Sequence, residues 1–305
     1  MAKTALVTGG AGFIGSHVVD RLVSDGLNVV AVDNLSRGVP PHLNADAAFY
    51  EMDEGSDAFA TLFESTKPDY VFHLAARASV NQSVRDPLGD VNKNVLACVN
   101  VLEQCKRFGV ERFIQSSTGG ALYGDPQYLP CDENHPILPR SPYGAGKAAV
   151  ENYISAYGVI GGVDYTILRY GNVYGPRQDP LGEAGVVAIM TNRMIKGEGV
   201  IIFGDGEQSR DFVYVGDVVQ ANMQAREQEI NDVFNVGTGV GTTVNAIFEQ
   251  LAKATDYNEP VKREPVNPGE IYKIHLSNAK ASEKLGWAPK VDLAEGLAET
   301  VAYFS

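Results

Sequence analysis

The chain has 305 residues, of which 44% are hydrophobic, and a formal net charge of −13. This size and composition allow a large buried core, which excludes a small peptide-like scaffold and suits one large domain or two unequal ones. The negative charge disfavours nucleic acid as a partner, because binding its backbone requires a basic face. An anionic small ligand would have to be held by arginines and helix N-termini that gather locally.

The three cysteines, Cys98, Cys105 and Cys131, show neither CxxC spacing nor a paired framework. We therefore expect reduced thiols, no bound metal and no disulfide-stapled secreted fold. From Lys3 the chain runs directly into an apolar strand, and it contains no apolar stretch of about 18 residues. We expect a cytoplasmic protein that has no membrane partner.

Up to about residue 168 the chain alternates short apolar or β-branched runs with amphipathic stretches of helical period. We expect strands at residues 4–8, 28–32, 70–75, 112–116 and 165–168. We expect helices at residues 15–25, 57–66, 92–108 and 143–159, with the clearest stops at Gly26 and Gly109. The alternation predicts an α/β fold of the Rossmann type, a doubly wound parallel sheet covered on both faces.

The second half of the chain has longer loops and separate helices, near residues 185–196, 244–255, 278–285 and 293–303. We predict a main domain of residues 1–170, to whose sheet residues 211–237 return. We predict a smaller C-terminal substrate-binding lobe of residues 171–210 and 238–305.

A glycine-rich loop follows the first predicted strand and opens the first predicted helix. It carries the GxGxxG spacing as Gly10, Gly12 and Gly15, and Gly9 provides an offset version. Glycines allow a tight turn and a close approach of the backbone, so that the helix N-terminus can bind a pyrophosphate. Because strand, loop and helix coincide, the loop predicts a dinucleotide site.

Asp33 ends the second predicted strand, eighteen residues after Gly15. A carboxylate there accepts hydrogen bonds from both adenosine ribose hydroxyls and repels a 2′-phosphate, which predicts NAD rather than NADP. Arg37 follows four residues later and can accommodate a 2′-phosphate, stack beside the adenine or face solvent. The sequence leaves these three roles open.

Tyr143 and Lys147 form a YxxxK motif at the start of a predicted helix, with both side chains on one face. The lysine ammonium favours the phenolate form of the tyrosine, whose pKa starts at about 10, and makes it usable as a base. The fourth predicted strand ends in three hydroxyl residues, Ser116, Ser117 and Thr118, at the sheet edge where ligands bind. Together these groups predict proton transfer at a substrate hydroxyl.

These residues resemble those of the extended short-chain dehydrogenase/reductase family, in particular its nucleotide-sugar epimerase branch. The resemblance runs through residues 8–17, 33–38, 73–76, 116–124, 143–147, 169–178, 204–217 and 267–270. It implies an NAD cofactor, a UDP-sugar substrate and a catalytic set of Thr118, Tyr143 and Lys147. Ser117 is the reserve candidate for the hydroxyl.

The resemblance also implies an NAD-binding set that includes Tyr143 and Lys147. In it Asp53 contacts the adenine, and Tyr170 lies near the nicotinamide. Ala75, Ala76 and Asn94 line the ribose and phosphate path. The ordinary alternatives are packing on the strand for the two alanines and a satisfied core polar group for Asn94. The remaining members are Gly9, Gly12, Phe13, Ile14, Gly15, Asp33, Asn34, Ser36, Arg37 and Gly38.

For the nucleotide sugar, the resemblance implies a second set of contacts. Phe203 lies beside the uracil, Arg210 on the pyrophosphate and Glu270 at the uridine ribose. The other members are Thr118, Asn172 and, at a helix start, Val187. An arginine and a helix start suit an anion, although Arg210 can equally pair with Asp211.

One position departs from the family pattern. Asn267 stands where the family often has an arginine, so a phosphate contact is missing or comes from Lys262 or Arg263.

Gly119 and Gly120 follow Thr118, where the family's dehydratases usually carry Asp-Glu and its decarboxylases a Glu. Without such a carboxylate, the expected reaction is reversible oxidation at C4. It would interconvert UDP-glucose and UDP-galactose through a transient 4-keto sugar, with NAD tightly bound. A dehydratase or reductase on the same scaffold, or a non-catalytic NAD-binding regulator, is the alternative.

Two positions bear on the choice of sugar. Ile274 falls where galactose-type epimerases often carry a tyrosine, so UDP-N-acetylglucosamine is the second candidate substrate. Asp179 would repel a sugar carboxylate, which ranks UDP-glucuronate third.

The family usually dimerises through two helices of each subunit, here the predicted helices 92–108 and 143–159. We therefore expect a homodimer, although packing on the sheet also explains the apolar residues of these helices.

Overall fold

The structure, a computed structural model, describes residues 2–182, 185–266 and 271–305. The chain forms two compact units, of residues 1–118, 141–169 and 219–234, and of residues 119–140, 170–218 and 235–305. Residues 119–140, assigned to the main domain from the sequence, thus belong to the second unit. There Cys131 forms a β-bridge with Leu276, and the Tyr123 hydroxyl donates to Asn235 Oδ1 at 2.7 Å.

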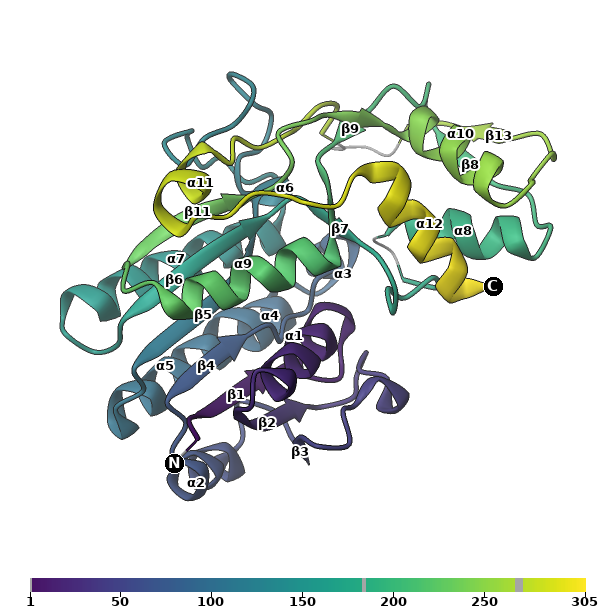
Figure 1. The fold of residues 1–305 in the computed structure, drawn as a ribbon. Helices are drawn as coiled ribbons and strands as arrows, with labels where there is room; N and C mark the ends of the chain where they lie inside the picture. The colour runs from purple at the N-terminus through teal and green to yellow at the C-terminus, as the bar shows by residue number, and fades with distance from the viewer. Residues whose placement is uncertain (1, 183–184, 267–270) are drawn as a thin grey trace. The chain divides into compact units, whose positions relative to one another are not determined.

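A sheet with the strand order β11-β6-β5-β4-β1-β2-β3 forms the centre of the first unit (Figure 1). Its strands are β1 (Thr4–Thr8), β2 (Asn28–Asp33), β3 (Ala48–Glu51), β4 (Tyr70–His73), β5 (Arg112–Thr118), β6 (Tyr165–Tyr170) and β11 (Asp232–Val236). β1 pairs in parallel with β2 and β4, as do β2 with β3 and β4 with β5. The order reverses between β1 and β4, which confirms the predicted doubly wound fold and directs ligands to the carboxyl ends of these strands.

Helices cover both faces of this sheet (Figure 1). On one face lie α1 (Phe13–Ser24) and α9 (Val215–Glu227), joined by a 3.2 Å hydrogen bond from Arg21 to Gln220. On the other lie α2 (Asp57–Thr66), α5 (Ala97–Phe108) and α7 (Pro142–Val159). Their apolar faces and the strands share one buried core, which includes Phe59, Leu102 and Ile154. Burial of each such side chain contributes about 1.5–3 kcal/mol.

The segment before α5 is more finely divided than the sequence predicted. It comprises α3 (Val80–Arg85), α4 (Pro87–Asp90) and the π-helical segment η2 (Val91–Leu96), which runs directly into α5. Ser79 caps α3 by accepting the Gln82 N–H at 3.1 Å, and Asp86 caps α4 by accepting the Gly89 N–H at 2.9 Å. A short 3-10 helix, η1 (Pro40–His42), and β3 were also not predicted.

The second unit has its own apolar core between three helices. These are α8 (Val186–Ile195), α10 (Val244–Ala254) and α12 (Leu293–Phe304), all close to predicted positions. Its short strands are β7 (Asn172–Tyr174), β8 (Ile201–Phe203), β9 (Ser209–Arg210), β10 (Phe212–Tyr214), β12 (Thr242–Thr243) and β13 (Lys262–Glu264). They pair as β7 with β10, β8 with β13 and β9 with β12. Two further short helices are α6 (Gly119–Leu122) and α11 (Ala279–Leu285).

Among the described residues, no helix combines the length and the apolar character needed to cross a membrane. The three cysteines are free and buried.

Candidate active site

The glycine loop of the first unit is packed so closely that side chains are excluded. Gly9 has a φ of +68°, and a Cβ atom on it would lie 2.8 Å from the backbone N of Ala75. A Cβ atom on Gly15 would lie 2.0 Å from the carbonyl O of Gly9. Both positions therefore require glycine, as the sequence predicts for a loop that meets a ligand with its backbone.

Helix α1 begins directly after this loop. Its N-cap residue is Gly12, and no side chain accepts a hydrogen bond from its first turn. The backbone N–H groups of Phe13 and Ile14 thus have no capping side chain. A helix N-terminus of this kind fits a phosphate group.

Asp33, the last residue of β2, is held by both of its carboxylate oxygens. Oδ2 accepts the Ala11 N–H at 3.1 Å, and Oδ1 accepts the Leu35 N–H at 2.9 Å. Asp33 is only 7% exposed, and a Cβ atom on Gly38 would lie 2.6 Å from its Oδ1. Because each oxygen can accept a further hydrogen bond, the arrangement fits the ribose hydroxyls of an NAD adenosine.

The residues predicted to lie near the adenine are joined by hydrogen bonds. Asp53 forms an ion pair with Lys93 of η2 and accepts the Asn34 amide N–H at 3.4 Å. The hydrogen bond from Lys93 holds the pKa of Asp53 below its ordinary value. Asn34 Oδ1 in turn accepts the Ser36 N–H at 3.0 Å, and the Arg37 side chain is exposed.

Asn94 fixes the segment that follows β4. Its Oδ1 accepts the Arg77 N–H at 2.8 Å, and its Nδ2 donates to Asp90 Oδ1 at 3.0 Å and to the Arg77 carbonyl O at 3.3 Å. Asn94 is 4% exposed. Its amide therefore positions the backbone next to Ala75 and Ala76, both of which are half-buried.

Tyr143 and Lys147 lie one turn apart at the start of α7. The Tyr143 backbone N–H donates to Ser83 Oγ of α3 at 3.1 Å, and Lys147 Nζ donates to the Ser116 carbonyl O of β5 at 2.8 Å. Lys147 is 5% exposed. The first turn of α7 is thus fixed to a neighbouring helix and to the end of a central strand.

The protonation of this pair differs from the expectation that the lysine would lower the tyrosine pKa. Burial lowers the pKa of Lys147 to about 8. Burial, together with the charge of Asp90, raises the pKa of Tyr143 above its ordinary value. Desolvation by the protein therefore outweighs the attraction between phenolate and ammonium.

Ser117 and Thr118 are successive strand residues and point to opposite faces of the sheet. Ser117 is 5% exposed, and its hydroxyl donates to Glu151 Oε1 at 2.5 Å. Glu151 also forms a buried ion pair with Arg169 at 2.6 Å. Thr118 is half-buried, and its hydroxyl makes no hydrogen bond within the described residues. Of the two candidates, Thr118 is the one whose hydroxyl can meet a ligand.

Three predicted site residues of the second unit differ in how far they are exposed. Tyr170 is 3% exposed, whereas Asn172 is exposed and donates its backbone N–H to the Asp211 carbonyl O at 2.6 Å. Val187 lies in the first turn of α8, but its side chain is 1% exposed in the apolar core. A ligand contact at this position would therefore come from its backbone N–H.

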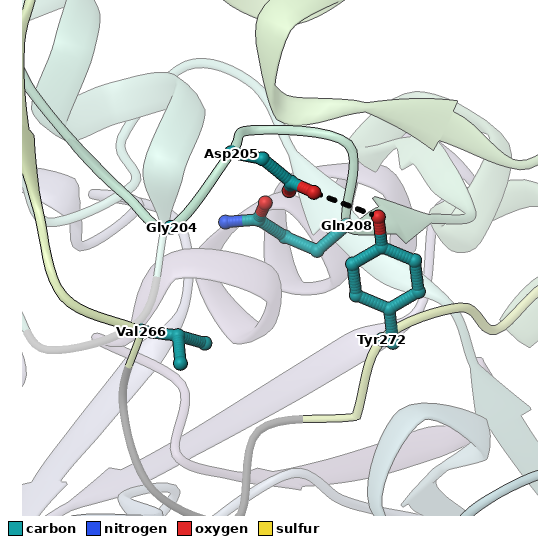
Figure 2. A pocket seen from close by; sticks show the side chains of 5 residues that line it. All are labelled: Gly204, Asp205, Gln208, Val266 and Tyr272. Carbon is teal, nitrogen blue, oxygen red and sulfur yellow. Dashed lines mark hydrogen bonds between the residues drawn. The ribbon is translucent and has the colours of Figure 1, made fainter.

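A pocket of about 260 Å³ lies within the second unit (Figure 2). It is lined by Gly204, Asp205, Gln208, Val266 and Tyr272. The Tyr272 hydroxyl donates to Asp205 Oδ2 at 3.0 Å across it. The pocket is smaller than the roughly 300–1,000 Å³ of sites for drug-sized ligands, so it suits one part of a larger molecule.

The predicted ligand residues Phe203 and Arg210 flank this segment of the chain. Phe203 is 37% exposed and directly precedes Gly204. The Arg210 guanidinium donates to the Ser209 carbonyl O at 2.9 Å. The Asp211 carboxylate accepts backbone N–H groups of residues 238 and 239, at 2.7 and 3.1 Å.

The alternative phosphate contacts lie on β13. Lys262 forms an exposed ion pair with Glu264 at 2.7 Å, and Arg263 donates to an α10 side chain at 3.1 Å. Asn267 and Glu270 lie outside the described residues.

Ile274, the position linked to the choice of sugar, is 2% exposed. It packs in a small apolar cluster with Tyr123, Cys131 and Leu276. The Ile274 side chain is therefore part of the core of the second unit.

Several residues that complete the first unit's site were not predicted: Ser83, Asp90, Lys93 and Glu151. Asp86-Pro87 is a helix-start signal that could have indicated α4, on which Asp90 lies. No local signal pairs Lys93 with Asp53 or Glu151 with Ser117, because the partners are 40 and 34 residues apart.

The doubly wound sheet, the glycine loop and the buried strand-end carboxylate together define a dinucleotide-binding α/β enzyme. A profile of the NAD dependent epimerase/dehydratase family matches residues 5–237, and the chain belongs to this family. The match confirms the predicted family and the prediction of NAD as the cofactor.

Individual relatives match over nearly the whole chain. The UDP-glucose 4-epimerase of Mycolicibacterium smegmatis is 43% identical, over 98% of this chain and 97% of its own. A solved structure of UDP-glucose 4-epimerase with UDP-glucose from Thermotoga maritima is 52% identical, with a TM-score of 0.97 over 99% and 98% of the two chains. That of Thermus thermophilus, in complex with NAD, is 43% identical, with a TM-score of 0.95 over 99% and 98%.

Proposed function

We propose that this enzyme is a UDP-glucose 4-epimerase, of class EC 5.1.3.2, which interconverts UDP-glucose and UDP-galactose. The observation that carries the proposal is the 2.8 Å hydrogen bond from Lys147, one turn after Tyr143, to the Ser116 carbonyl O of the strand that ends at Thr118. Gly119 and Gly120 follow in place of an acidic pair. The similarity to proteins with this name supports the same substrate.

The chemistry at C4 follows from the roles of three side chains. Tyr143, as the phenolate, removes the proton of the sugar 4-hydroxyl, and the Thr118 hydroxyl relays it. Lys147 holds its ammonium at the end of β5 by donating to the Ser116 carbonyl O, which favours the phenolate. NAD, when bound, would supply the hydride acceptor and donor for the oxidation and re-reduction at C4. No net redox change results.

The first unit would hold the cofactor through the groups described above. The N–H groups after Gly12 would bind its pyrophosphate, and Asp33 would bind its adenosine ribose. Asp53, oriented by Lys93, would lie at the adenine. A carboxylate at the ribose disfavours a 2′-phosphate, which agrees with NAD.

The second unit would hold the nucleotide of the substrate. The pocket of about 260 Å³ is suited to part of a uridine, and Phe203 beside it offers a half-exposed aromatic face for the base. Arg210 would bind the pyrophosphate, because a guanidinium suits bidentate contacts to phosphate oxygens.

We propose that the protein works in the cytoplasm as a homodimer. Leu96 on η2 and Tyr153 on α7 are large apolar side chains with 56% and 47% exposure, and they support an interface on these helices. The three free thiols agree with a reducing compartment. Sedimentation of the wild type and of Tyr153→Glu tests the dimer, which the added charge should dissociate.

The purified protein, without added cofactor, is incubated separately with UDP-glucose, UDP-galactose, UDP-N-acetylglucosamine and UDP-glucuronate. Chromatography should show the first pair interconverting fastest, with no net change in NADH absorbance. Faster turnover of an acetamido sugar or of UDP-glucuronate would replace the substrate while keeping the reaction. Loss of water from the sugar, or no turnover after NAD is supplied, would overturn the assignment.

A further inference from the structure

Asp90 is a buried carboxyl group with an unsatisfied oxygen. It ends α4, and its side chain is 0% exposed. Oδ1 accepts the Asn94 amide at 3.0 Å, but Oδ2 has no hydrogen-bond partner within the described residues. Leaving a buried polar atom without a partner is costly, so such an atom calls for an explanation.

This oxygen lies against the catalytic turn of α7. A Cβ atom on Gly146 would be 3.4 Å from Asp90 Oδ2, and Gly146 stands between Tyr143 and Lys147 in the YxxxK motif. The glycine leaves the helix backbone bare on this side. The carboxyl group therefore approaches the one turn of α7 that carries both catalytic candidates.

The same segment of the chain also anchors the tyrosine mechanically. Ser83 Oγ, in α3, accepts the Tyr143 backbone N–H at 3.1 Å. Asn94, which holds Asp90, also fixes the Arg77 backbone by hydrogen bonds to its N–H and carbonyl O. Asp90 is thus positioned by the same hydrogen-bonded network that supports α7.

We propose that Asp90 is a positioning residue of the active site, whose buried negative charge restrains Tyr143 from losing its proton. The proposal rests on the proposed role of Tyr143 as the base. A carboxylate beside a phenol disfavours the phenolate, and beside a lysine it favours the ammonium. One side chain thereby keeps the tyrosine protonated and the lysine charged until ligands alter the balance.

The charges around the pair are consistent with this role. After burial, the charge of Asp90 raises the pKa of Tyr143, and it also raises that of Lys147. Burial raises the pKa of Asp90 itself. The hydrogen bond from Asn94 and the charges of Arg77 and Lys147 lower it, and the charge of Asp86 raises it.

Glu151 and Cys98 act on Lys147 in the same direction as Asp90. Burial lowers the pKa of His73, on β4, and the charge of Lys147 lowers it further.

The test compares the NAD-bound wild type with Asp90→Asn, which removes the charge and keeps an acceptor for Asn94. Tyrosinate formation is followed by ultraviolet absorbance against pH, and the Tyr143→Phe counterpart of each protein is subtracted to isolate Tyr143. In Asp90→Asn, Tyr143 should ionise roughly one pH unit lower, a tenfold change in its equilibrium. The acidic limb of kcat/KM should shift equally, with KM unchanged.

Asp86→Asn is the matched control, because it removes the same charge from a side chain that is 54% exposed. Solvent should screen its effect, so the Tyr143 titration should coincide with that of the wild type. Asp90→Ser, which leaves a small hydroxyl, should reproduce the shift of Asp90→Asn and separates charge from packing.

Coincident Tyr143 titrations for the wild type, Asp90→Asn and Asp90→Ser would overturn the proposal, as would an equal shift in Asp86→Asn. The absorbance titration requires no turnover. A protein that lacks epimerase activity but shows the shift would therefore refute the proposed function and retain the role of Asp90.

Discussion

The Ser117 hydroxyl donates a 2.5 Å hydrogen bond to Glu151 Oε1. This contact gives Ser117 a different role from Thr118, the adjacent hydroxyl residue of β5. Glu151 is held on its other side by Arg169, through contacts of 3.1, 3.1 and 2.6 Å. Ser117 is therefore committed to a buried polar network between the strand and α7. Thr118, the next residue, remains available for chemistry.

Substitution of the two hydroxyl residues should have opposite consequences. Thr118→Val keeps the shape of the side chain but removes the relay, so kcat should fall by roughly 10²-fold or more, with unchanged stability. Ser117→Ala should leave kcat within about threefold but lower the free energy of unfolding by roughly 1–3 kcal/mol, because it leaves a buried carboxylate short of a donor. Steady-state kinetics and urea titration measure the two effects. A loss of kcat in Ser117→Ala alone would assign the relay to that residue.

Removing one partner of the buried ion pair should destabilise the fold more than removing both. Arg169→Met leaves Glu151 buried without its cation, which should cost about 3–5 kcal/mol of unfolding free energy. The double substitution Glu151→Leu with Arg169→Met should recover part of this loss, since no unpaired charge is left. Urea denaturation of the wild type, Arg169→Met, Glu151→Leu and the double variant gives the comparison. A double variant that is the sum of both single losses would contradict the argument.

Lys147 should make stability rise with pH on the alkaline side. Its pKa is about 8 in the folded protein, against an ordinary value of 10.5. Below about pH 8 both folded and unfolded chains carry the proton, and the cost of burying the charge is fully present. Between these two values the folded chain releases the proton first, so stability increases, by roughly 3 kcal/mol in total.

Urea titrations of the wild type and Lys147→Met between about pH 7 and pH 10 check this change. The difference in unfolding free energy should shift in favour of the wild type as pH rises. A difference that is flat with pH would mean that the lysine is not desolvated as described.

His73 should make the protein sensitive to acid. Burial lowers its pKa to about 3, from an ordinary value of 6.5, and its ring lies 2.7 Å from Thr8 Oγ1. The stability that neutral, buried His73 contributes is fully present above its ordinary pKa. It is lost as pH falls through this window, because the unfolded chain gains a proton that the folded chain cannot take up.

His73→Asn, which cannot titrate, should therefore flatten the decline in thermal stability between about pH 6.5 and pH 4. Thermal unfolding of both proteins across this range is the measurement. Parallel declines in wild type and variant would contradict the prediction.

Much of the scaffold could be predicted because its signals are local. β1 has the expected bounds, Thr4–Thr8, and α2 does as well, Asp57–Thr66. α5 stops at Gly109, whose φ of +70° is the left-handed conformation that glycine adopts without a Cβ penalty. The glycine loop could equally be predicted from the sequence, because its close contacts are made within a short stretch of chain and with the next strands.

The positions of the side chains that support the candidate active site could not be predicted from local signals. The π-helical start of the predicted helix 92–108, and the short helices α3 and α4 before it, depend on packing against α7 as much as on propensity. The raised pKa of Tyr143 shows the same limit. The spacing to Lys147 gave the right neighbour, but burial and Asp90 determine the sign of the shift.

The sequence by itself therefore determined the sheet, the dinucleotide loop and the identity of the YxxxK pair, because periodicity, turn chemistry and motif spacing act over a few residues. Only the tertiary structure decided that Ser117, rather than Thr118, is bonded to Glu151, and that Lys93 meets Asp53. The same holds for the approach of Asp90 to Gly146. These contacts join residues 34 to 56 positions apart. The electrostatic effect of a carboxyl group on its neighbours depends on distance and on the exclusion of water, and the order of residues specifies neither.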